Sequence, residues 1–364
     1  MLNTQLLASI LGVFELPALS LPKSHIFHRF LAKFVGIFNF FIPIYPGFLL
    51  IHVLIFIMSK VAIILSSYNG ENYIKEQIDS LLAQDFPDFS IFVRDDGSTD
   101  GTLQVLEGLP VTLVQDAPGQ PNLNLGFGPS FTAALLAAYR DSRGFDYFAF
   151  CDQDDYWEPG KLAAAARLLD GATPDQPALF SHNYYVCDDK LNILSSWTNT
   201  NPMQEGVTFS NMAFEGVFPG FTLVINRRLA ELAFAGDPTP DIFYHDKWVS
   251  LITLGLSGNI FFDTAPLARY RRHQGAVSST DKGGLAKLRW RINNVLKGDF
   301  CLQTHRMLEL YRQLFFDQVS PDSQHFLEVF TSGSYFAKLF YPGSLRRSAS
   351  GSIMLRLMIL IGKI

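Results

Sequence analysis

Apolar and polar positions alternate along the chain in a way that predicts an α/β fold from Lys60 onward. The run 61–65 is continuously apolar, which is typical of a strand covered on both faces. The next segment, "ENYIKEQIDSLLAQ", carries an apolar stripe at helical spacing. Further strands are expected at "FSIFV", at 111–114 and at 147–151, with the helix "FTAALLAAYR" before the last of them. This βαβαβ order predicts a mostly parallel, doubly wound central sheet flanked by helices.

Beyond the fourth strand the pattern becomes more mixed. "GKLAAAARLLD" predicts a helix, "VCDDKLNIL" a hairpin, "FTLVINRRLAEL" a strand running into a helix, and "HDKWVSLITLGLSG" another helix. After roughly residue 284 the pattern is helical and more basic. We therefore expect an α/β domain over 59–280 and a C-terminal helical extension over 281–364.

The first 58 residues differ from the rest. The stretch 34–58 contains no Asp, Glu, Lys or Arg and is long enough to span a bilayer, although Pro43, Pro46 and His52 interrupt it. Met58 is followed at once by "SKVAIILSSYNG", a natural start for the α/β domain. Residues 1–57 are thus explained equally well as a membrane segment or as an upstream extension with no role in the native protein.

The C-terminal tail is also apolar. In "RRSASGSIMLRLMILIGKI", the cations Arg346, Arg347, Arg356 and Lys363 are interspersed among aliphatic residues. Such a pattern suits a helix lying on an anionic membrane surface. A short helix packed into the core explains it as well.

Composition narrows the class of protein. The chain has 364 residues, 48% of them hydrophobic, enough for one large domain with appendages. A net charge of −5 argues against a nucleic-acid partner. The three cysteines (Cys151, Cys187 and Cys301) are widely spaced and form no CxxC pair, which fits a cytoplasmic setting. Cys151 is expected to pack inside its strand.

Segments rich in carboxylate, hydroxyl and amide side chains lie at the ends of three of the predicted strands: "SSYNGE", "DDGSTD" and "DQDD". In doubly wound sheets, ligands bind at the carboxyl ends of the strands, so this coincidence favours an enzyme. Asp152 and Asp154 are two positions apart and would point the same way on an extended backbone. Two such carboxylates suit Mg²⁺ or Mn²⁺ completed by phosphate oxygens, which implies a diphosphate ligand. Asp155 could support them or cap the next helix, and a solvated acidic turn is the alternative for the whole cluster.

The other two segments suit a nucleotide. Tyr68 offers a flat face on which a base can stack, and Ser66 can hydrogen-bond it. Glu71 lies where the next helix begins. In "RDDGSTD" the two adjacent carboxylates point to opposite sides, so one of them can accept hydrogen bonds from uracil, thymine or ribose.

Taken together, "VAIILSSYNGENYIKEQIDSLLAQDFPDFSIFVRDDGSTDGT" and "FCDQDDYWEPGKL" resemble glycosyltransferase family 2, and most of all bacterial rhamnosyltransferases of surface-polysaccharide synthesis. The similarity runs from about Lys60 to Ser278 and implies a GT-A-type nucleotide-sugar fold. It implies that the nucleotide pocket and the metal-binding DXD motif are formed by Ser66, Tyr68, Glu71, Asp96, Asp152 and Asp154. Asp96 would take the base, and Asp154 would be the direct metal ligand.

Later motifs are similar to the same family. "PGFTLVINRRL" matches the strand beside the acceptor site, and "YHDKWVSL" the segment of the catalytic base, which would be Asp246. "RYRRHQGAVS" matches the closing segment, where His273 could contact the metal or the diphosphate. Ala276 stands where the family often has Asn, which weakens that assignment. From the residues alone, Asp246 can also be a carboxylate favoured at a helix N-terminus, and His273 a packed or surface histidine. His245, Trp157 and Trp248 are expected to be structural.

The resemblance implies an inverting, metal-dependent glycosyltransferase that uses a dTDP- or UDP-sugar, with rhamnose a candidate. Its acceptor would be a surface polysaccharide or lipid-linked glycan at the inner face of the cytoplasmic membrane. One rival is a sugar-1-phosphate nucleotidyltransferase, which needs a Gly-rich basic loop after the first strand; "SSYNGENY" has one Gly and no basic residue. The other is an inactive sugar- or lipid-binding membrane protein, against which the intact acidic motif and Asp246 argue.

Overall fold

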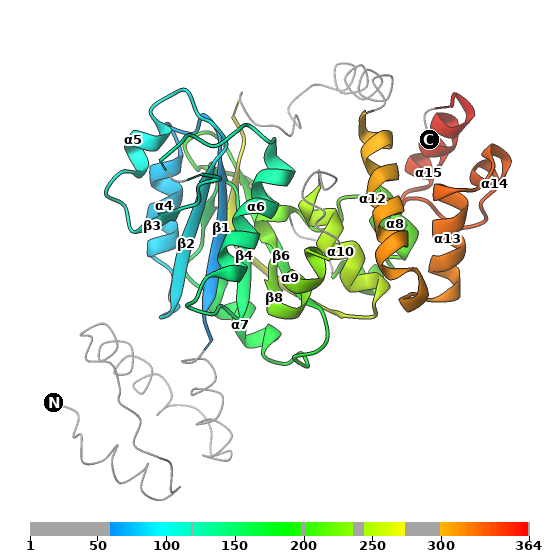
Figure 1. Cartoon of the computed structure of the whole chain (residues 1–364), viewed down its shortest axis with the longest axis horizontal. Helices are drawn as coiled ribbons and strands as arrows, with labels where there is room; N and C mark the ends of the chain where they lie inside the picture. Colours follow the sequence, from blue (N-terminus) through cyan, green and yellow to red (C-terminus); the bar gives the residue numbers. More distant parts are fainter. Residues whose placement is uncertain (1–58, 118, 198–200, 236–243, 274–298, 363–364) are drawn as a thin grey trace, which may run out of the picture. The chain divides into compact units, whose positions relative to one another are not determined.

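A computed structural model describes residues 59–117, 119–197, 201–235, 244–273 and 299–362 (Figure 1). The apolar stretch 34–58 lies outside the described residues, so the two explanations of the first 57 residues both stand. None of the described helices has the length and apolar character needed to cross a bilayer.

Nine strands in the described part of the chain join in one mixed sheet. They are β1 (Val61–Ser67), β2 (Phe89–Asp95), β3 (Val111–Leu113), β4 (Tyr147–Cys151), β5 (Tyr156–Trp157), β6 (Ala178–Cys187), β7 (Ile193–Trp197), β8 (Val224–Asn226) and β9 (Asn259–Arg271). The order is β3-β2-β1-β4-β8-β6-β9-β5, with β7 beside β6.

The predicted βαβαβ half of the sheet is confirmed: β3, β2, β1 and β4 are all parallel. The other half is more mixed than the sequence indicated. β6 and β9 are parallel, but β8 runs antiparallel to both β4 and β6, and β5 and β7 are antiparallel additions. The predicted hairpin is β6–β7, and the predicted strand-to-helix segment is β8 with the helix that follows it.

Eleven α-helices of at least five residues lie in the described segments. They are α4 (Ile74–Leu82), α5 (Thr102–Leu106), α6 (Phe127–Arg140), α7 (Lys161–Leu169), α8 (Phe209–Phe214), α9 (Arg227–Ala233), α10 (His245–Gly255), α12 (Asp299–Phe315), α13 (Pro321–Thr331), α14 (Tyr335–Leu339) and α15 (Ala349–Leu360). Short 3-10 turns occur at Pro202–Glu205, Gly220–Thr222 (η2) and Phe316–Gln318.

The sheet is buried on both faces, as the apolar run of β1 predicted. Ala62 and Ile64 enter one core with residues of α6, α8, α9 and α10, whereas Val61, Ile63 and Leu65 enter another with residues of α4, α5 and α7. This split follows from the alternation of side chains along a strand. Cys151 and Cys187 are buried free thiols, so Cys151 packs within its strand as expected.

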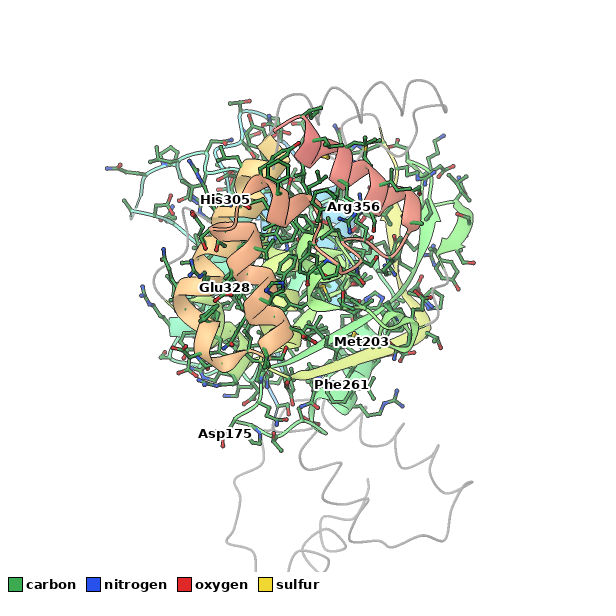
Figure 2. All side chains as sticks on the ribbon, turned by 90° about the vertical axis from the view of Figure 1, so that its right-hand side faces the viewer. Asp175, Met203, Phe261, His305, Glu328 and Arg356 are labelled. Carbon is green, nitrogen blue, oxygen red and sulfur yellow. The ribbon has the colours of Figure 1, made fainter. Side chains whose placement is uncertain are left out.

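The C-terminal helices share the first of these cores. Tyr311 on α12, Phe326 on α13 and Leu355 on α15 are buried in the same cluster as α6 and α10. Figure 2 views this side of the protein, with His305 on α12, Glu328 on α13 and Arg356 on α15 labelled. The predicted helical extension is confirmed, and its helices pack onto the α/β domain rather than forming a core of their own.

The contact between α10 and α12 leaves no room at Gly255. A Cβ there would overlap the hydroxyl oxygen of Tyr311 and lie 2.8 Å from Phe209 Cε2. We expect Gly255→Ala to lower the free energy of unfolding by about 1–3 kcal/mol in urea titrations, even though Ala favours helices by about 1 kcal/mol. The cost should be smaller in a Tyr311→Phe background, because the overlapping oxygen is removed. An equal cost in both backgrounds would contradict this packing.

Candidate functional site

The three polar segments meet at one edge of the sheet, as predicted, because β2, β1 and β4 are parallel neighbours (Figure 1). Hydrogen bonds join the segments directly. The Asn69 amide donates to Ser98 Oγ (2.8 Å), and the Thr99 amide donates to Asn69 Oδ1 (2.8 Å). The loop after β1 is therefore fastened to the loop after β2.

Gln153, the middle residue of the acidic motif, fastens the third segment, a role that the sequence did not reveal. The Tyr68 amide donates to Gln153 Oε1 (2.9 Å), and Gln153 Nε2 donates to the Tyr68 carbonyl (3.0 Å). Gly70 makes room for this pair, since a Cβ at that position would overlap the Gln153 side chain. The Asn69-Gly70 turn was the only sequence signal of such a close approach.

The backbone of the acidic motif is a turn rather than an extended strand. β4 ends at Cys151, and Gln153 and Asp154 form a turn. The extended-backbone reason for pairing Asp152 with Asp154 is thus wrong. The carboxylates nevertheless share one environment. Burial, followed by the charges of Asp154 and Asp246, raises the pKa of Asp152 above its ordinary range.

Asp155 is the most buried carboxylate of the motif. It accepts a hydrogen bond from the Arg271 amide (3.1 Å), and its Oδ2 has no partner among the described residues. Burial, with the charges of Asp154 and Asp152, raises its pKa well above the usual range. Asp155 does not cap the following helix, because α7 begins after Gly160. Its hydrogen bond to the Arg271 amide instead joins the motif to the end of β9.

Arg271 and His273, at the end of β9 and just after it, contact the acidic motif. His273 Nε2 lies 2.8 Å from Asp154 Oδ2, and its ring packs on Tyr73 with centroids 4.5 Å apart. Arg271 Nε donates to the Asp154 carbonyl (2.8 Å), and its Nη2 pairs with Glu76 (2.5 Å). His273 thus contacts a predicted metal ligand; its own contact with a metal or diphosphate stays a prediction.

Asp246 reaches the same place from the first turn of α10. Its Oδ1 accepts a hydrogen bond from the Lys247 amide (2.8 Å), which is the contact expected of a helix N-terminal carboxylate. Its charge also acts on Asp152, and its Oδ2 is 4.0 Å from the position of a Cβ on Gly216. The fold therefore brings the predicted base beside the acidic motif, and its catalytic role stays a prediction.

His245 packs as a structural residue. Its ring lies 4.2 Å from that of Phe131 and 4.8 Å from that of Phe150, and both ring nitrogens lack a partner in the described segments. Burial lowers its pKa to about 4. Trp157 and Trp248 are buried core residues, also as expected.

Of the predicted nucleotide residues, Tyr68 and Glu71 are exposed, Tyr68 with 48% of its surface accessible. Ser66 Oγ donates to Ser130 Oγ (2.8 Å) at the end of β1. Glu71 Oε2 accepts from the Gly101 amide (2.6 Å) and so closes the turn after β2. Ser66, Tyr68 and Glu71 all belong to the first of the three joined segments, "SSYNGE".

Asp96 is buried and already holds three donors. Its carboxylate accepts from Arg94 Nη1 (2.5 Å) and from the amides of Leu125 (2.9 Å) and Gly126 (2.9 Å). A carboxylate has about four acceptor positions, so one contact remains for a base unless a donor is exchanged. The neighbouring Asp95 bonds Ser67 and Ser98 instead, so the two carboxylates do point apart.

Lys161 is a fully buried cation that the sequence did not single out. Its Nζ donates to the Phe221 carbonyl (2.5 Å) and lies 3.3 Å from the centre of the Trp157 ring. Burial lowers the pKa of Lys161 to about 7, and the negative charges of Asp155 and Asp152 oppose this shift. Lys161 thus ties α7 to η2 close to the carboxylates of the acidic motif.

The residues present fit a divalent ion completed by a ligand. Within the described part of the chain, no three His, Cys, Asp or Glu side chains converge as a ready-made metal cage. Mg²⁺ in phosphate-binding sites needs only one or two carboxylates, because phosphate oxygens and water supply the rest. The crowding of negative charge around Asp152 is the feature that such an ion would relieve.

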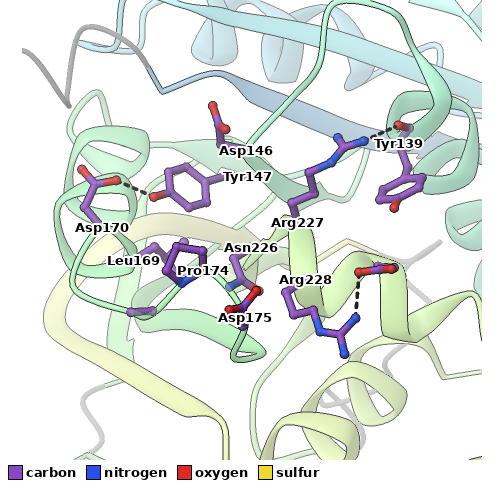
Figure 3. A pocket seen from close by; sticks show the side chains of 12 residues that line it. Tyr139, Asp146, Tyr147, Leu169, Asp170, Pro174, Asp175, Asn226, Arg227 and Arg228 are labelled. Carbon is purple, nitrogen blue, oxygen red and sulfur yellow. Dashed lines mark hydrogen bonds and ion pairs between the residues drawn. The ribbon is translucent and has the colours of Figure 1, made fainter.

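A cavity of about 800 Å³ lies away from these residues, at the opposite end of β4 (Figure 3). It is lined by Tyr139, Asp146, Tyr147, Leu169, Asp170, Ala172, Pro174, Asp175, Asn226, Arg227, Arg228 and Glu231. Tyr147 hydrogen-bonds Asp170, and Arg228 pairs with Glu231 (2.8 Å). None of the predicted site residues lines this cavity.

The buried His245 makes stability depend on pH. Its pKa is about 4 when folded and about 6.5 when unfolded, so between these values only the unfolded chain takes up the proton. The contribution of neutral His245 to the free energy of unfolding is fully present above pH 6.5 and is lost as the pH falls towards 4. From pH 7 to pH 5, wild type should lose about 2 kcal/mol more unfolding free energy than His245→Phe in urea titrations. Parallel pH dependences would show that His245 takes up its proton in the native state.

The α/β domain is similar in sequence to known proteins. Residues 62–229 match the family described as glycosyl transferase family 2. The chain is 28% identical over 216 residues to the dTDP-rhamnosyl transferase RfbG of Shigella flexneri, covering 58% of this chain and 72% of that protein. It is 24% identical over 258 residues to the Escherichia coli UDP-Glc:alpha-D-GlcNAc-diphosphoundecaprenol beta-1,3-glucosyltransferase WfaP, covering 70% and 92%.

Among solved structures, Staphylococcus aureus TarS 1–349 in complex with UDP-GlcNAc is similar, with a TM-score of 0.46 and 18% identity over 84% of this chain and 91% of that one. A likeness of that degree indicates nothing about the substrate. The family match sets the nucleotidyltransferase alternative aside, and the GT-A-type α/β fold implied by the motifs is confirmed. Residues 62–229 are a glycosyltransferase family 2 domain, and the protein is a glycosyltransferase.

Proposed function

We propose that the protein is an inverting, metal-dependent glycosyltransferase that transfers a sugar from a dTDP- or UDP-linked donor to a hydroxyl of a surface-polysaccharide or lipid-linked glycan. The observation that carries this proposal is that Asp246, which comes from a distant helix, lies near enough to Asp152 and Asp154 for their charges to act on one another. Inversion needs a base and a leaving-group site at one reaction centre, and these residues supply both.

Asp246 acts as the base. In a transfer with inversion, the acceptor hydroxyl attacks the anomeric carbon from the side opposite the departing diphosphate, and a carboxylate must remove its proton. Asp246 Oδ1 accepts from its own helix, which leaves Oδ2 for the acceptor. Gly216 lies beside that oxygen and has no side chain, which leaves space for an acceptor sugar to approach Oδ2.

Asp152 and Asp154 would hold the cation. Mg²⁺ or Mn²⁺ bound there would supply positive charge to the leaving diphosphate. His273 and Arg271 fix the position of Asp154, and Lys161 balances part of the negative charge that remains beneath it. Tyr68 stacks on the nucleobase, with Ser66, Glu71 and Asp96 shaping the loops around it.

The names of the relatives support the class of substrate. One is a dTDP-rhamnosyl transferase, so rhamnose is the first sugar to test. The other names UDP-glucose and an acceptor on diphosphoundecaprenol, which supports a lipid-linked glycan at the inner face of the cytoplasmic membrane.

Two substitutions separate the roles of the carboxylates. With a panel of nucleotide sugars and Mn²⁺, Asp246→Asn should lower the release of nucleoside diphosphate in the presence of acceptor by about 10²–10⁴-fold. It should keep the Mn²⁺-dependent rise in melting temperature that the donor causes. Asp154→Asn should lose both, because Asp154 would be a ligand of the cation and its carboxylate is removed.

Asp79→Asn is the matched control, since Asp79 is an exposed carboxylate of α4 paired with Lys75 and should leave both readouts unchanged. Unchanged Mn²⁺-dependent donor binding in Asp154→Asn would refute the metal role. Donor binding by wild type without turnover on any acceptor would favour an inactive binding protein instead.

A further inference from the structure

The last helix, α15, has two apolar stripes, and only one of them packs on the protein. Leu355, Met358 and Ile359 are buried in the core shared with α12 and α13. Ile353, Leu357 and Leu360 recur at the spacing of one helix face and are 59%, 49% and 50% exposed. The two explanations of the tail, core helix and surface helix, therefore both apply, each to its own side of α15.

The neighbouring helix α14 adds aromatic residues to this exposed surface. Phe336 and Phe340 are 67% and 73% exposed, and Tyr335 Oη donates to the Leu360 carbonyl (3.0 Å), which joins α14 to the end of α15. We call the exposed side chains of Phe336, Phe340, Ile353, Leu357, Leu360 and Ile361 the α14–α15 face. Large apolar side chains gathered in this way usually mark an interaction surface.

The charge around this face is positive, opposite to that of the whole chain. Residues 333–364 contain five Lys or Arg and no Asp or Glu, whereas the complete chain has a net charge of −5. Arg346 and Arg347 pair with Glu215. Arg356 donates only to backbone carbonyls of 339, 341 and 343, and no described carboxylate lies within ion-pair distance of Arg356 or Lys338.

The segment that precedes α15 is fastened to the acceptor side of the site. Ser210 Oγ and Asn211 Nδ2 both donate to the Ser344 carbonyl (2.9 and 2.8 Å), and Arg347 Nε pairs with Glu215 (2.8 Å). Glu215 directly precedes Gly216, which faces Asp246. The segment that leads into α15 is thereby joined to the loop that carries Gly216.

We propose that the α14–α15 face docks on the surface of an anionic lipid bilayer, with α15 lying in the plane of the interface. Exposed aliphatic and aromatic side chains enter the headgroup region, and the uncompensated cations attract anionic headgroups. A second copy of the chain fits less well, because a symmetric interface would bring the same cations together. This inference rests on the proposed function only for the lipid-linked acceptor that such docking would bring within reach.

Co-sedimentation of the full chain with vesicles tests the docking. Wild type should bind vesicles of phosphatidylglycerol and phosphatidylethanolamine, and bind vesicles of phosphatidylcholine less. Binding to the anionic vesicles should weaken in about 0.5 M NaCl. A double variant, Ile353→Glu with Leu357→Glu, should bind these vesicles at least about tenfold more weakly. The reason is that apolar side chains that would enter the bilayer are replaced by anions.

The matched control is Ile193→Glu with Leu103→Glu, which changes side chains that are 52% and 44% exposed outside this face and should leave vesicle binding unchanged. Melting temperatures verify that both double variants are folded. Equal vesicle binding by the two double variants would overturn the proposal. So would a wild-type dimer in sedimentation velocity that the α15 variant converts to a monomer without any change in vesicle binding.

The two proposals fail separately. Nucleoside diphosphate release with a water-soluble acceptor should be the same in wild type and in the α15 double variant. Vesicle binding without any such release would disprove only the transferase chemistry, whereas release without vesicle binding would disprove only the docking surface.

Discussion

Buried negative charge at the end of β4 is the constraint on which the rest of the structure depends. Three aspartates follow a fully buried strand, and desolvating carboxylates is costly unless positive charge or hydrogen bonds compensate them. The protein compensates from two directions. The buried Lys161 acts on Asp152, and Arg271 contacts the motif from the end of β9. Burial and the charges of Asp154 and Asp246 still raise the pKa of Asp152, and a bound cation would oppose that shift.

Strands from both halves of the sheet end near the motif. The parallel half delivers the three polar loops, and β9 of the mixed half delivers Arg271 and His273. Lys161 connects the surroundings of the acidic motif with those of the predicted base. Its hydrogen bond to the Phe221 carbonyl joins α7 to η2, and Gly220 of η2 lies against His245 and Asp246. The predicted base and the predicted metal ligands are thus held by one buried lysine as well as by the sheet.

The sequence predicted what depends on local pattern. Apolar runs located the strands, and the continuous apolar run of β1 implied burial on both faces, because successive side chains of a strand point to opposite sides of the sheet. The sequence could not predict contacts that depend on where segments meet. Gln153 looked like a spacer between two carboxylates, and Lys161 like an ordinary helix residue. The donors that occupy Asp96 come from the distant loop at 125–126. The antiparallel strands β5 and β7 were missed or only partly expected, because their pairing follows from the path of the chain and not from composition.

The reciprocal amide contact between Gln153 and the backbone of Tyr68 has a consequence for recognition. It makes the aromatic ring that would carry a base and the carboxylates that would carry a pyrophosphate parts of a single preassembled unit with a fixed separation. A nucleotide long enough to span that separation would engage both ends without ordering either loop, and so would avoid an entropic cost of binding. A shorter molecule, such as a free base or an isolated pyrophosphate, would reach only one end. The site would therefore favour ligands of nucleoside diphosphate length, whatever sugar they carry.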